Sequence, residues 1–209
     1  MPARAILSLV IDRSVLRGGL EAAVEAAVAG GVDWVQVRER GAGGEALAAL
    51  TDRVRGAAER GAGRRGGEVK LFVNRRCDVA LACRADGVHL GFDALPSREA
   101  RRLLGPEALL GRSLHDAAEI DPEDGSSYVH LAPIFPPLSK ASTRPALGLE
   151  GLRAACRRGI PVLAQGGVDS ANAGAILEAG AAGIAVTGAI LMEADPGAAA
   201  AGLRRRLDA

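Results

Sequence analysis

Short apolar runs rich in β-branched residues alternate with segments of helical period eight times along the chain, and this alternation constrains the fold more than any other feature. Runs that are almost continuously apolar predict strands buried on both faces. Strands that are each followed by a helix pair in parallel, because the helix returns the chain to the same end of the sheet. The predicted strands are Ile6–Ile11, Trp34–Arg38, Lys70–Asn74, Gly87–Leu90, Leu109–Ser113, Tyr128–Ala132, Pro161–Gln165 and Gly183–Thr187.

The predicted helices are Leu20–Ala29, Gly44–Arg60, Cys77–Cys83, Ser97–Leu104, His115–Ile120, Leu149–Arg158, Ala171–Ala179 and Gly197–Leu207. Eight strand–helix units within 209 residues predict an α/β fold, a (β/α)8 TIM barrel with short loops that forms a single domain over residues 1–209. The alternative is a doubly wound open sheet. Such a sheet normally has a glycine-rich phosphate loop after its first strand, where this chain has Asp12, Arg13 and Ser14.

Composition excludes several classes of protein. The chain has 26 basic and 25 acidic residues, a balance that argues against a nucleic-acid-binding surface. No apolar run is long enough to span a membrane. The three cysteines, Cys77, Cys83 and Cys156, form neither a disulfide framework nor a metal-binding motif. We therefore expect a cytoplasmic protein with no nucleic-acid or membrane partner.

Polar residues at the C-terminal ends of the predicted strands are the candidate ligand-binding groups, because active sites of this barrel lie at that end. They include Arg38 and Arg40 and almost no carboxylates. A cationic rim of this kind suits an anionic small molecule, most simply a phosphate ester. The candidates for binding the substrate and its phosphate are Gln36, Arg40, Asn74, Ser113, Gly166, Gly167, Thr187 and Gly188.

Glycines after the last two predicted strands refine this prediction. Gln165-Gly166-Gly167 ends the seventh strand, and Thr187-Gly188 ends the eighth directly before a helical turn. Backbone N–H groups of these two loops form the recurrent phosphate site of the fold. The alternative is that the glycines only make tight turns.

The longest irregular stretch, residues 132–145, follows the sixth predicted strand. Long loops in compact domains are commonly lids or binding loops. Lys140 in this loop is a cation suited to covering a phosphate, and it is therefore a candidate catalytic residue. A solvated, proline-rich connection is the alternative.

Seven sequence motifs lie in collinear order between Ile6 and Leu191. They are Val35–Arg40, Phe72–Leu81, Ala85–Gly91, Leu110–His115, Pro133–Pro136, Leu147–Leu152 and Pro161–Gly167. Together they resemble the thiamine phosphate synthase superfamily, which also contains the TenI-type thiazole tautomerases. The resemblance implies the same barrel, an enzyme of thiamine biosynthesis, and a thiazole phosphate as the small-molecule ligand.

Two positions depart from the synthase pattern. The synthase joins a hydroxymethylpyrimidine diphosphate to a thiazole phosphate and releases diphosphate with magnesium. Arg75 and Ala94 stand where its two magnesium aspartates belong, and Asp93 is one residue out of register. Because magnesium is anchored by carboxylates beside phosphates, this departure predicts that the site holds no metal. The resemblance places the diphosphate-binding groups at Gln36, Arg38, Arg40, Asn74, Ser113 and Lys140.

The tautomerase moves a proton within a thiazole carboxylate phosphate and needs no metal. The segments Arg38–Arg40 and Gly111–His115 resemble this branch. The histidine associated with its chemistry aligns with Pro133, and the nearest substitute is His130. Synthase-like sequences favour small residues at this position, which implies that His130 faces a ligand. A histidine there would titrate near neutral pH and shuttle a proton, whereas a hydrogen-bonded core histidine is the alternative.

We therefore predict a TenI-like thiazole tautomerase without a cofactor, with His130, Arg38 and Lys140 as its catalytic residues. The alternative is thiamine phosphate synthase, which would add Mg²⁺ as a cofactor. A second alternative is a homologue that binds a phosphate ester without catalysing a reaction. His89 is interpreted as structural and His115 as the start of a helix. The oligomeric state stays open, with a homodimer as the common default.

Overall fold

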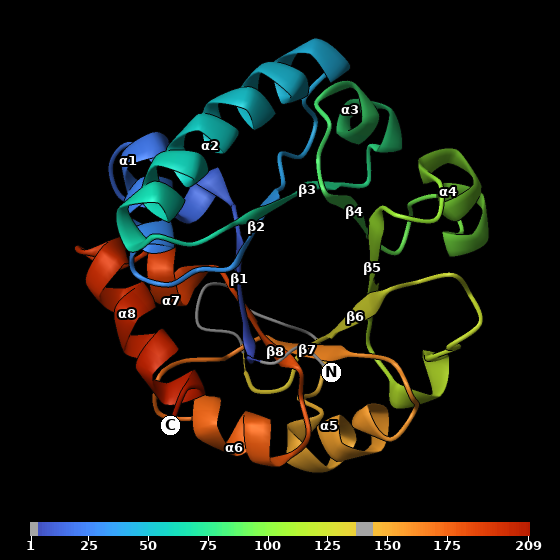
Figure 1. The fold of residues 1–209 in the computed structure, drawn as a ribbon. Coiled ribbons are helices and arrows are strands. Elements are labelled where there is room, and N and C mark those ends of the chain that lie inside the picture. The colour runs from blue at the N-terminus through green and yellow to red at the C-terminus, as the bar shows by residue number, and fades with distance from the viewer. Residues whose placement is uncertain (1–3, 137–143) are drawn as a thin grey trace.

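The computed structural model describes residues 4–136 and 144–209, and it shows eight parallel strands closed into a barrel (Figure 1). Each strand pairs with its neighbours in sequence, and the last pairs with the first. The predicted (β/α)8 barrel is therefore confirmed, and the open sheet is excluded. The strands are β1 (Ile6–Val10), β2 (Trp34–Val37), β3 (Lys70–Asn74), β4 (Gly87–Leu90), β5 (Leu109–Leu114), β6 (Tyr128–Leu131), β7 (Val162–Gln165) and β8 (Gly183–Val186).

Helices surround the barrel on its outer side (Figure 1). They are α1 (Leu20–Ala29), α2 (Gly44–Arg65), α3 (Cys77–Ala82), α4 (Ser97–Leu104), α5 (Gly148–Cys156), α6 (Ala173–Glu178), α7 (Gly188–Leu191) and α8 (Pro196–Leu207). Short 3-10 helices occur at Arg13–Val15 (η1) and Ala117–Glu119 (η2). None of the helices in the described part of the chain is long and apolar enough to cross a membrane.

The prediction of a helix over His115–Ile120 is wrong. Only η2 forms there, and Asp116 caps it by accepting a hydrogen bond from the N–H of Ala118 at 2.9 Å. The cap fixes the start of this turn after His115, so the histidine lies outside it. Its side chain is therefore free to take part in the pocket described below.

Aromatic side chains fill the interior of the barrel below its C-terminal end. The ring of Trp34 lies 4.8 Å from that of Phe72 and 4.9 Å from that of Tyr128, measured between centroids. A Cβ atom at Gly111 would overlap the Tyr128 ring, so glycine is required at that position. Side chains two residues further along a strand share the same face. The inner face of the barrel therefore continues above these rings with Gln36, Asn74 and His130.

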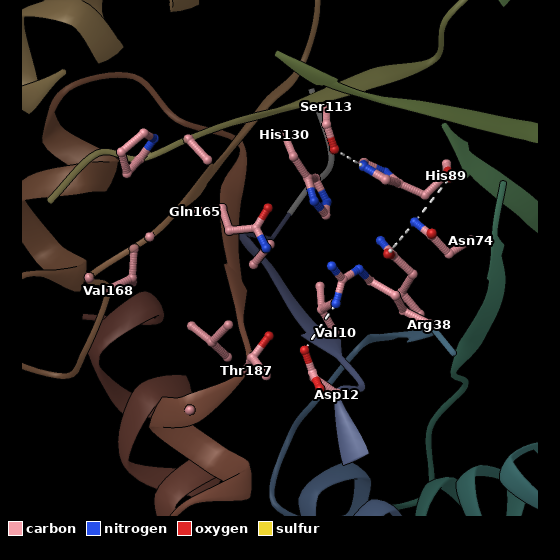
Figure 2. A pocket seen from close by; sticks show the side chains of 18 of the residues that line it. Val10, Asp12, Arg38, Asn74, His89, Ser113, His130, Gln165, Val168 and Thr187 are labelled. Atoms are coloured by element: carbon pink, nitrogen blue, oxygen red, sulfur yellow. Dashed lines mark hydrogen bonds and ion pairs between the residues drawn. The ribbon is translucent and has the colours of Figure 1, made fainter. Parts of the chain in front are cut away.

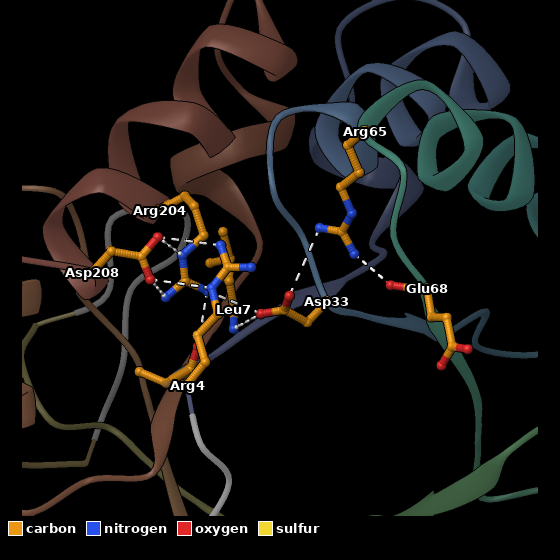
Figure 3. A network of polar contacts seen from close by, with 8 residues as sticks. Arg4, Leu7, Asp33, Arg65, Glu68, Arg204 and Asp208 are labelled. Atoms are coloured by element: carbon orange, nitrogen blue, oxygen red, sulfur yellow. Dashed lines mark hydrogen bonds and ion pairs between the residues drawn. The ribbon is translucent and has the colours of Figure 1, made fainter.

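A network of polar contacts ties α8 to the N-terminal end of the barrel (Figure 3). The Arg204 side chain is only 7% exposed, and its Nη1 donates to Asp33 Oδ2 at 3.0 Å and to the carbonyl of Ala5 at 2.8 Å. Its Nε donates to Asp208 at 3.0 Å. Asp33 also accepts the N–H of Leu7, at the start of β1, at 2.9 Å. The last helix and the first strand are thus held by the same pair of charges.

Replacing Arg204 with alanine is expected to lower the free energy of unfolding by about 3 kcal/mol, because the partly buried Asp33 carboxylate loses its main partner and keeps only the more distant guanidinium of Arg65, at 3.7 Å. Urea-induced unfolding measures this change. Arg206→Ala is the matched control, since Arg206 lies on the same helix and is exposed. An equal loss of stability in both variants would show that the network has no special role.

Candidate functional site

A pocket of about 530 Å³ opens at the C-terminal ends of the strands (Figure 2). Ten of the predicted site residues line it together. The remaining candidate, Lys140, lies outside the described residues. The ten are Gln36, Arg38, Arg40, Asn74, Ser113, His130, Gly166, Gly167, Thr187 and Gly188.

Guanidinium groups lie at the rim of the pocket. The Arg38 side chain is 20% exposed, and its Nη1 donates to Asp12 Oδ2 at 3.0 Å (Figure 2). Asp12 also accepts hydrogen bonds from the N–H and hydroxyl of Ser14, at 3.1 and 2.6 Å. Burial, with a further contribution from nearby Arg40, lowers the pKa of Arg38 from its ordinary value, yet a guanidinium remains charged in proteins. The rim therefore presents a fixed positive charge.

The Asp12 carboxylate holds Arg38 in place and stays ionised. Burial alone would raise the pKa of Asp12, but hydrogen bonds from Ser14 and the charge of Arg38 bring it below its ordinary value. Asp12 lines the pocket and is absent from the predicted site residues. Its place directly after the first strand is the sequence signal that points to it.

The floor of the pocket is polar and uncharged. The side-chain oxygen Oε1 of Gln36 accepts a hydrogen bond from Nδ2 of Asn74 at 3.1 Å. His89 Nε2 lies 2.8 Å from the Ser113 hydroxyl, and its Nδ1 lies 3.3 Å from the Tyr128 hydroxyl. Both ring nitrogens of His89 therefore have partners, as the structural interpretation of this histidine expects.

His130 packs against His89 with 4.1 Å between ring centroids (Figure 2). It is 1% exposed, and its Nε2 has no hydrogen-bond partner among the described residues. Burial lowers the pKa of His130 to about 3, although the nearby side chain of Gln165 acts in the opposite direction. The expectation that His130 titrates near neutral pH is therefore wrong, because the barrel interior removes the water that would solvate its charged form.

The two buried histidines make the fold sensitive to acid. In the unfolded chain each histidine takes up a proton with a pKa of about 6.5. Burial lowers the pKa of His89 as well, with His130 as a second cause. Below about pH 6.5 the unfolded chain therefore binds more protons than the folded one, and stability falls as the pH falls toward the folded-state pKa of His130, about 3.

Within this window, each histidine is expected to lower the free energy of unfolding by up to about 1.4 kcal/mol for every unit by which the pH falls, because the unfolded chain takes up the proton. Urea unfolding between about pH 7 and pH 5 measures the slope. His130→Phe keeps an aromatic ring in place and should remove its share of the slope. An identical slope in that variant and in the unaltered protein would refute the assignment of His130 as a buried neutral group.

Two glycine loops lie on another part of the rim. Gly166 and Gly167 follow β7 with φ of +90° and +62°, which favours glycine, and Gly188 begins α7 directly after β8. A Cβ atom at Gly166 would also lie 2.9 Å from the Cα of Pro133. None of the three N–H groups donates a hydrogen bond to another described residue. Backbone conformation therefore explains the choice of glycine at positions 166 and 167, and the three N–H groups stay available to an anion.

Phe92 and Arg144 also line the pocket and are absent from the predicted site residues. The Phe92 ring is 59% exposed and stacks on His115 with 4.0 Å between centroids. The guanidinium carbon of Arg144 lies 5.5 Å from the Phe92 centroid, and His115 Nδ1 is hydrogen-bonded to the carbonyl of Ala132. Aromatic residues make up only 2% of the chain, so a phenylalanine just after a strand is a usable sequence signal.

The residues at the positions of the magnesium aspartates do not fit a magnesium site. Arg75 Nη2 lies 2.8 Å from Asp93 Oδ2, and the Asp93 side chain is 72% exposed. The carboxylate nearest to these positions is thus already paired with a guanidinium, whereas magnesium is anchored by carboxylate oxygens. Among the residues described, no group of three or more His, Cys, Asp or Glu side chains could hold a metal ion.

Comparison with known proteins gives consistent matches over the whole barrel. A family model described as "Thiamine monophosphate synthase" matches residues 7–190. The thiamine-phosphate synthase of Chloroflexus aurantiacus is 42% identical over 203 residues, which cover 95% of this chain and 90% of that protein. The thiamine-phosphate synthase of Mycobacterium sp. (strain JLS) is 39% identical over 218 residues, with 98% and 93% covered. A solved structure of thiamine phosphate pyrophosphorylase from Pyrococcus furiosus superposes with a TM-score of 0.84 and 29% identity, covering 98% of this chain and 96% of that one.

Proposed function

The chain belongs to the thiamine monophosphate synthase family, and from this premise we propose that it is a thiamine phosphate synthase. The expectation of a TenI-like tautomerase is wrong, because relatives about 40% identical over nearly the whole chain are thiamine-phosphate synthases. The replacement of the two magnesium aspartates favours a tautomerase, but the similarity to synthases along the rest of the chain outweighs it.

The proposed reaction joins two phosphorylated rings. The ring nitrogen of a thiazole phosphate attacks the methylene carbon of hydroxymethylpyrimidine diphosphate. A carbon–nitrogen bond forms, the carbon–oxygen bond to the diphosphate breaks, and the electron pair of that bond leaves with diphosphate. Negative charge grows on the leaving group, so the reaction is accelerated by positive groups fixed beside it.

The observation that carries the proposal is that one pocket combines charged groups with neutral polar groups. Arg38 and Arg40 line the rim after β2, and the glycine loops line the rim after β7 and β8. Between them the floor is built of amide, hydroxyl and neutral imidazole groups. Such a pocket suits two ligands that each combine an anionic group with an uncharged ring.

Each part of the pocket has a task in this proposal. Arg38, held by Asp12 and mostly buried, stabilises the departing diphosphate, since charge interactions are stronger away from bulk water. The N–H groups of Gly166, Gly167 and Gly188 bind the phosphate of the thiazole. With both anions bound at the rim, the two rings meet between them, and the reaction proceeds as if it were intramolecular.

Growth of a bacterial strain that lacks its own thiamine phosphate synthase tests the proposal. Expression of this chain is expected to restore growth without added thiamine, and expression of the Arg38→Met variant is not. Failure of the unaltered chain to restore growth, although it accumulates as folded protein, would overturn the proposal.

We expect thiamine phosphate formation by the purified protein to be unchanged by EDTA. The residues that the structure describes form no carboxylate site for magnesium, and Asp93 is paired with Arg75, which stands at one of the aspartate positions. The initial rate is measured with and without the chelator. Loss of activity in EDTA that added magnesium restores would disprove this prediction. Arg75→Asp, which places a second carboxylate beside Asp93, is the variant expected to gain sensitivity to magnesium.

A further inference from the structure

His130 presents a buried nitrogen without a partner to the pocket. The residue lies within β6, next to Ser113 on β5 and Leu163 on β7. Its side chain lines the pocket, and its Nε2 is buried and unpaired among the described residues. Burying a polar atom without a hydrogen bond destabilises a protein. A ligand that bonds to this nitrogen would therefore regain the lost interaction.

The histidine beside it cannot take over this task. His89 already contacts Ser113 and Tyr128 through its two ring nitrogens. The rings of His89 and His130 lie 4.1 Å apart, so charging both would place two positive charges in contact inside the barrel. His130 thus offers a neutral imidazole nitrogen, which donates or accepts according to its tautomer.

The surroundings of His130 favour a neutral ring over a phosphate. The Gln165 side chain lies beside His130 (Figure 2), and the amides of Gln36 and Asn74 line the same pocket. The Arg38 guanidinium is held by Asp12 at the end of β1, and the open N–H groups that an anion requires lie in the loops after β7 and β8. Small side chains, Ala132 and Ala185, line the same pocket and leave space for a flat ligand.

We propose that His130 Nε2 hydrogen-bonds the pyrimidine ring of the diphosphate substrate and thereby determines specificity for that ring. The inference rests on the proposed function, in which both substrates carry nitrogen heterocycles. The thiazole nitrogen is the attacking atom and has to stay free of hydrogen bonds. The two ring nitrogens of a pyrimidine form no new bond, so either can pair with His130 throughout the reaction.

The unphosphorylated hydroxymethylpyrimidine is the probe, because it lacks the groups that the rim binds. The chain contains three histidines, so the imidazole resonances of isotope-labelled protein can be assigned with single variants. Addition of the probe is expected to shift the Nε2 resonance of His130, and addition of inorganic phosphate is not. No shift with saturating probe, or no binding of the probe at all, would overturn the proposal.

Two variants separate the hydrogen bond from the packing. His130→Phe keeps an aromatic ring against His89 and removes the nitrogen, whereas His130→Gln keeps a polar atom near the position of Nε2. We expect the dissociation constant of the probe to rise about tenfold in His130→Phe. In His130→Gln it should return most of the way to the value of the unaltered protein. The dissociation constant of thiazole phosphate should stay the same in both.

Equal affinity of the probe for all three proteins would refute the role of His130. Thermal unfolding shows which variants are folded, and His130→Gln provides the comparison should His130→Phe fail to fold. These measurements follow binding and not turnover. A protein that binds the pyrimidine through His130 without forming thiamine phosphate would therefore contradict the proposed function and leave this inference standing.

Discussion

Replacing Arg38 with methionine is expected to lower kcat/KM for thiamine phosphate formation by about 100- to 1,000-fold, the loss that follows removal of one fixed group that stabilises transition-state charge. Arg38 is mostly buried, so water replaces its charge poorly, and Asp12 holds it in one orientation. Methionine keeps the unbranched apolar stem and removes only the guanidinium. The expected effect is therefore electrostatic.

Initial rates over a range of both substrate concentrations measure this loss. Arg13→Met is the matched control, because Arg13 belongs to the nearby η1, pairs with Glu39 and is half exposed. Exposed ion pairs contribute little, so that variant should keep nearly full activity. Comparable activity in the Arg38 and Arg13 variants would remove Arg38 from the proposed machinery.

Replacing Gly188 with aspartate is expected to weaken binding of thiazole phosphate by at least about 100-fold. A carboxylate close to the bound phosphate would repel it by about 4 kcal/mol near a protein surface, and about 1.4 kcal/mol corresponds to a tenfold change in affinity. Gly188 is only partly exposed, so solvent cannot fully screen the two charges. Isothermal titration with thiazole phosphate measures the change.

Gly188→Ala distinguishes charge from crowding. Gly188 is absent from the glycines with positive φ, so alanine can adopt its helical backbone conformation. We expect this variant to bind within about threefold of the unaltered protein, a change of well under 1 kcal/mol. Unchanged binding in the aspartate variant, with its fold intact, would place the phosphate elsewhere.

The closed barrel could be predicted because each strand–helix unit carries its own periodicity. Helix ends depend instead on contacts that the sequence does not display. The prediction ends α2 at Arg60. The structure continues the helix to Arg65 because Gly61 allows close packing on α1, where a Cβ atom would overlap the carbonyl of Glu25. Gly66, with φ of +67°, then ends the helix.

The site was predictable where one rule applies, namely that ligands of this barrel meet the C-terminal ends of its strands. This rule finds Arg38 and the glycine loops, because each follows a strand directly. It misses Arg144, which lines the pocket but lies near the end of the irregular stretch 132–145 and does not follow a strand directly. The rule also cannot predict the protonation state of His130, because the burial of this side chain against the His89 ring is seen only in the folded structure.

The central claim, that this pocket joins a pyrimidine diphosphate to a thiazole phosphate, is tested most directly by measuring thiamine phosphate and diphosphate in the same reaction. The purified protein is supplied with both substrates, and with each alone. The account predicts equal amounts of the two products, formed only when both substrates are present. Diphosphate released without thiamine phosphate, or neither product from folded protein that binds both substrates, would contradict it.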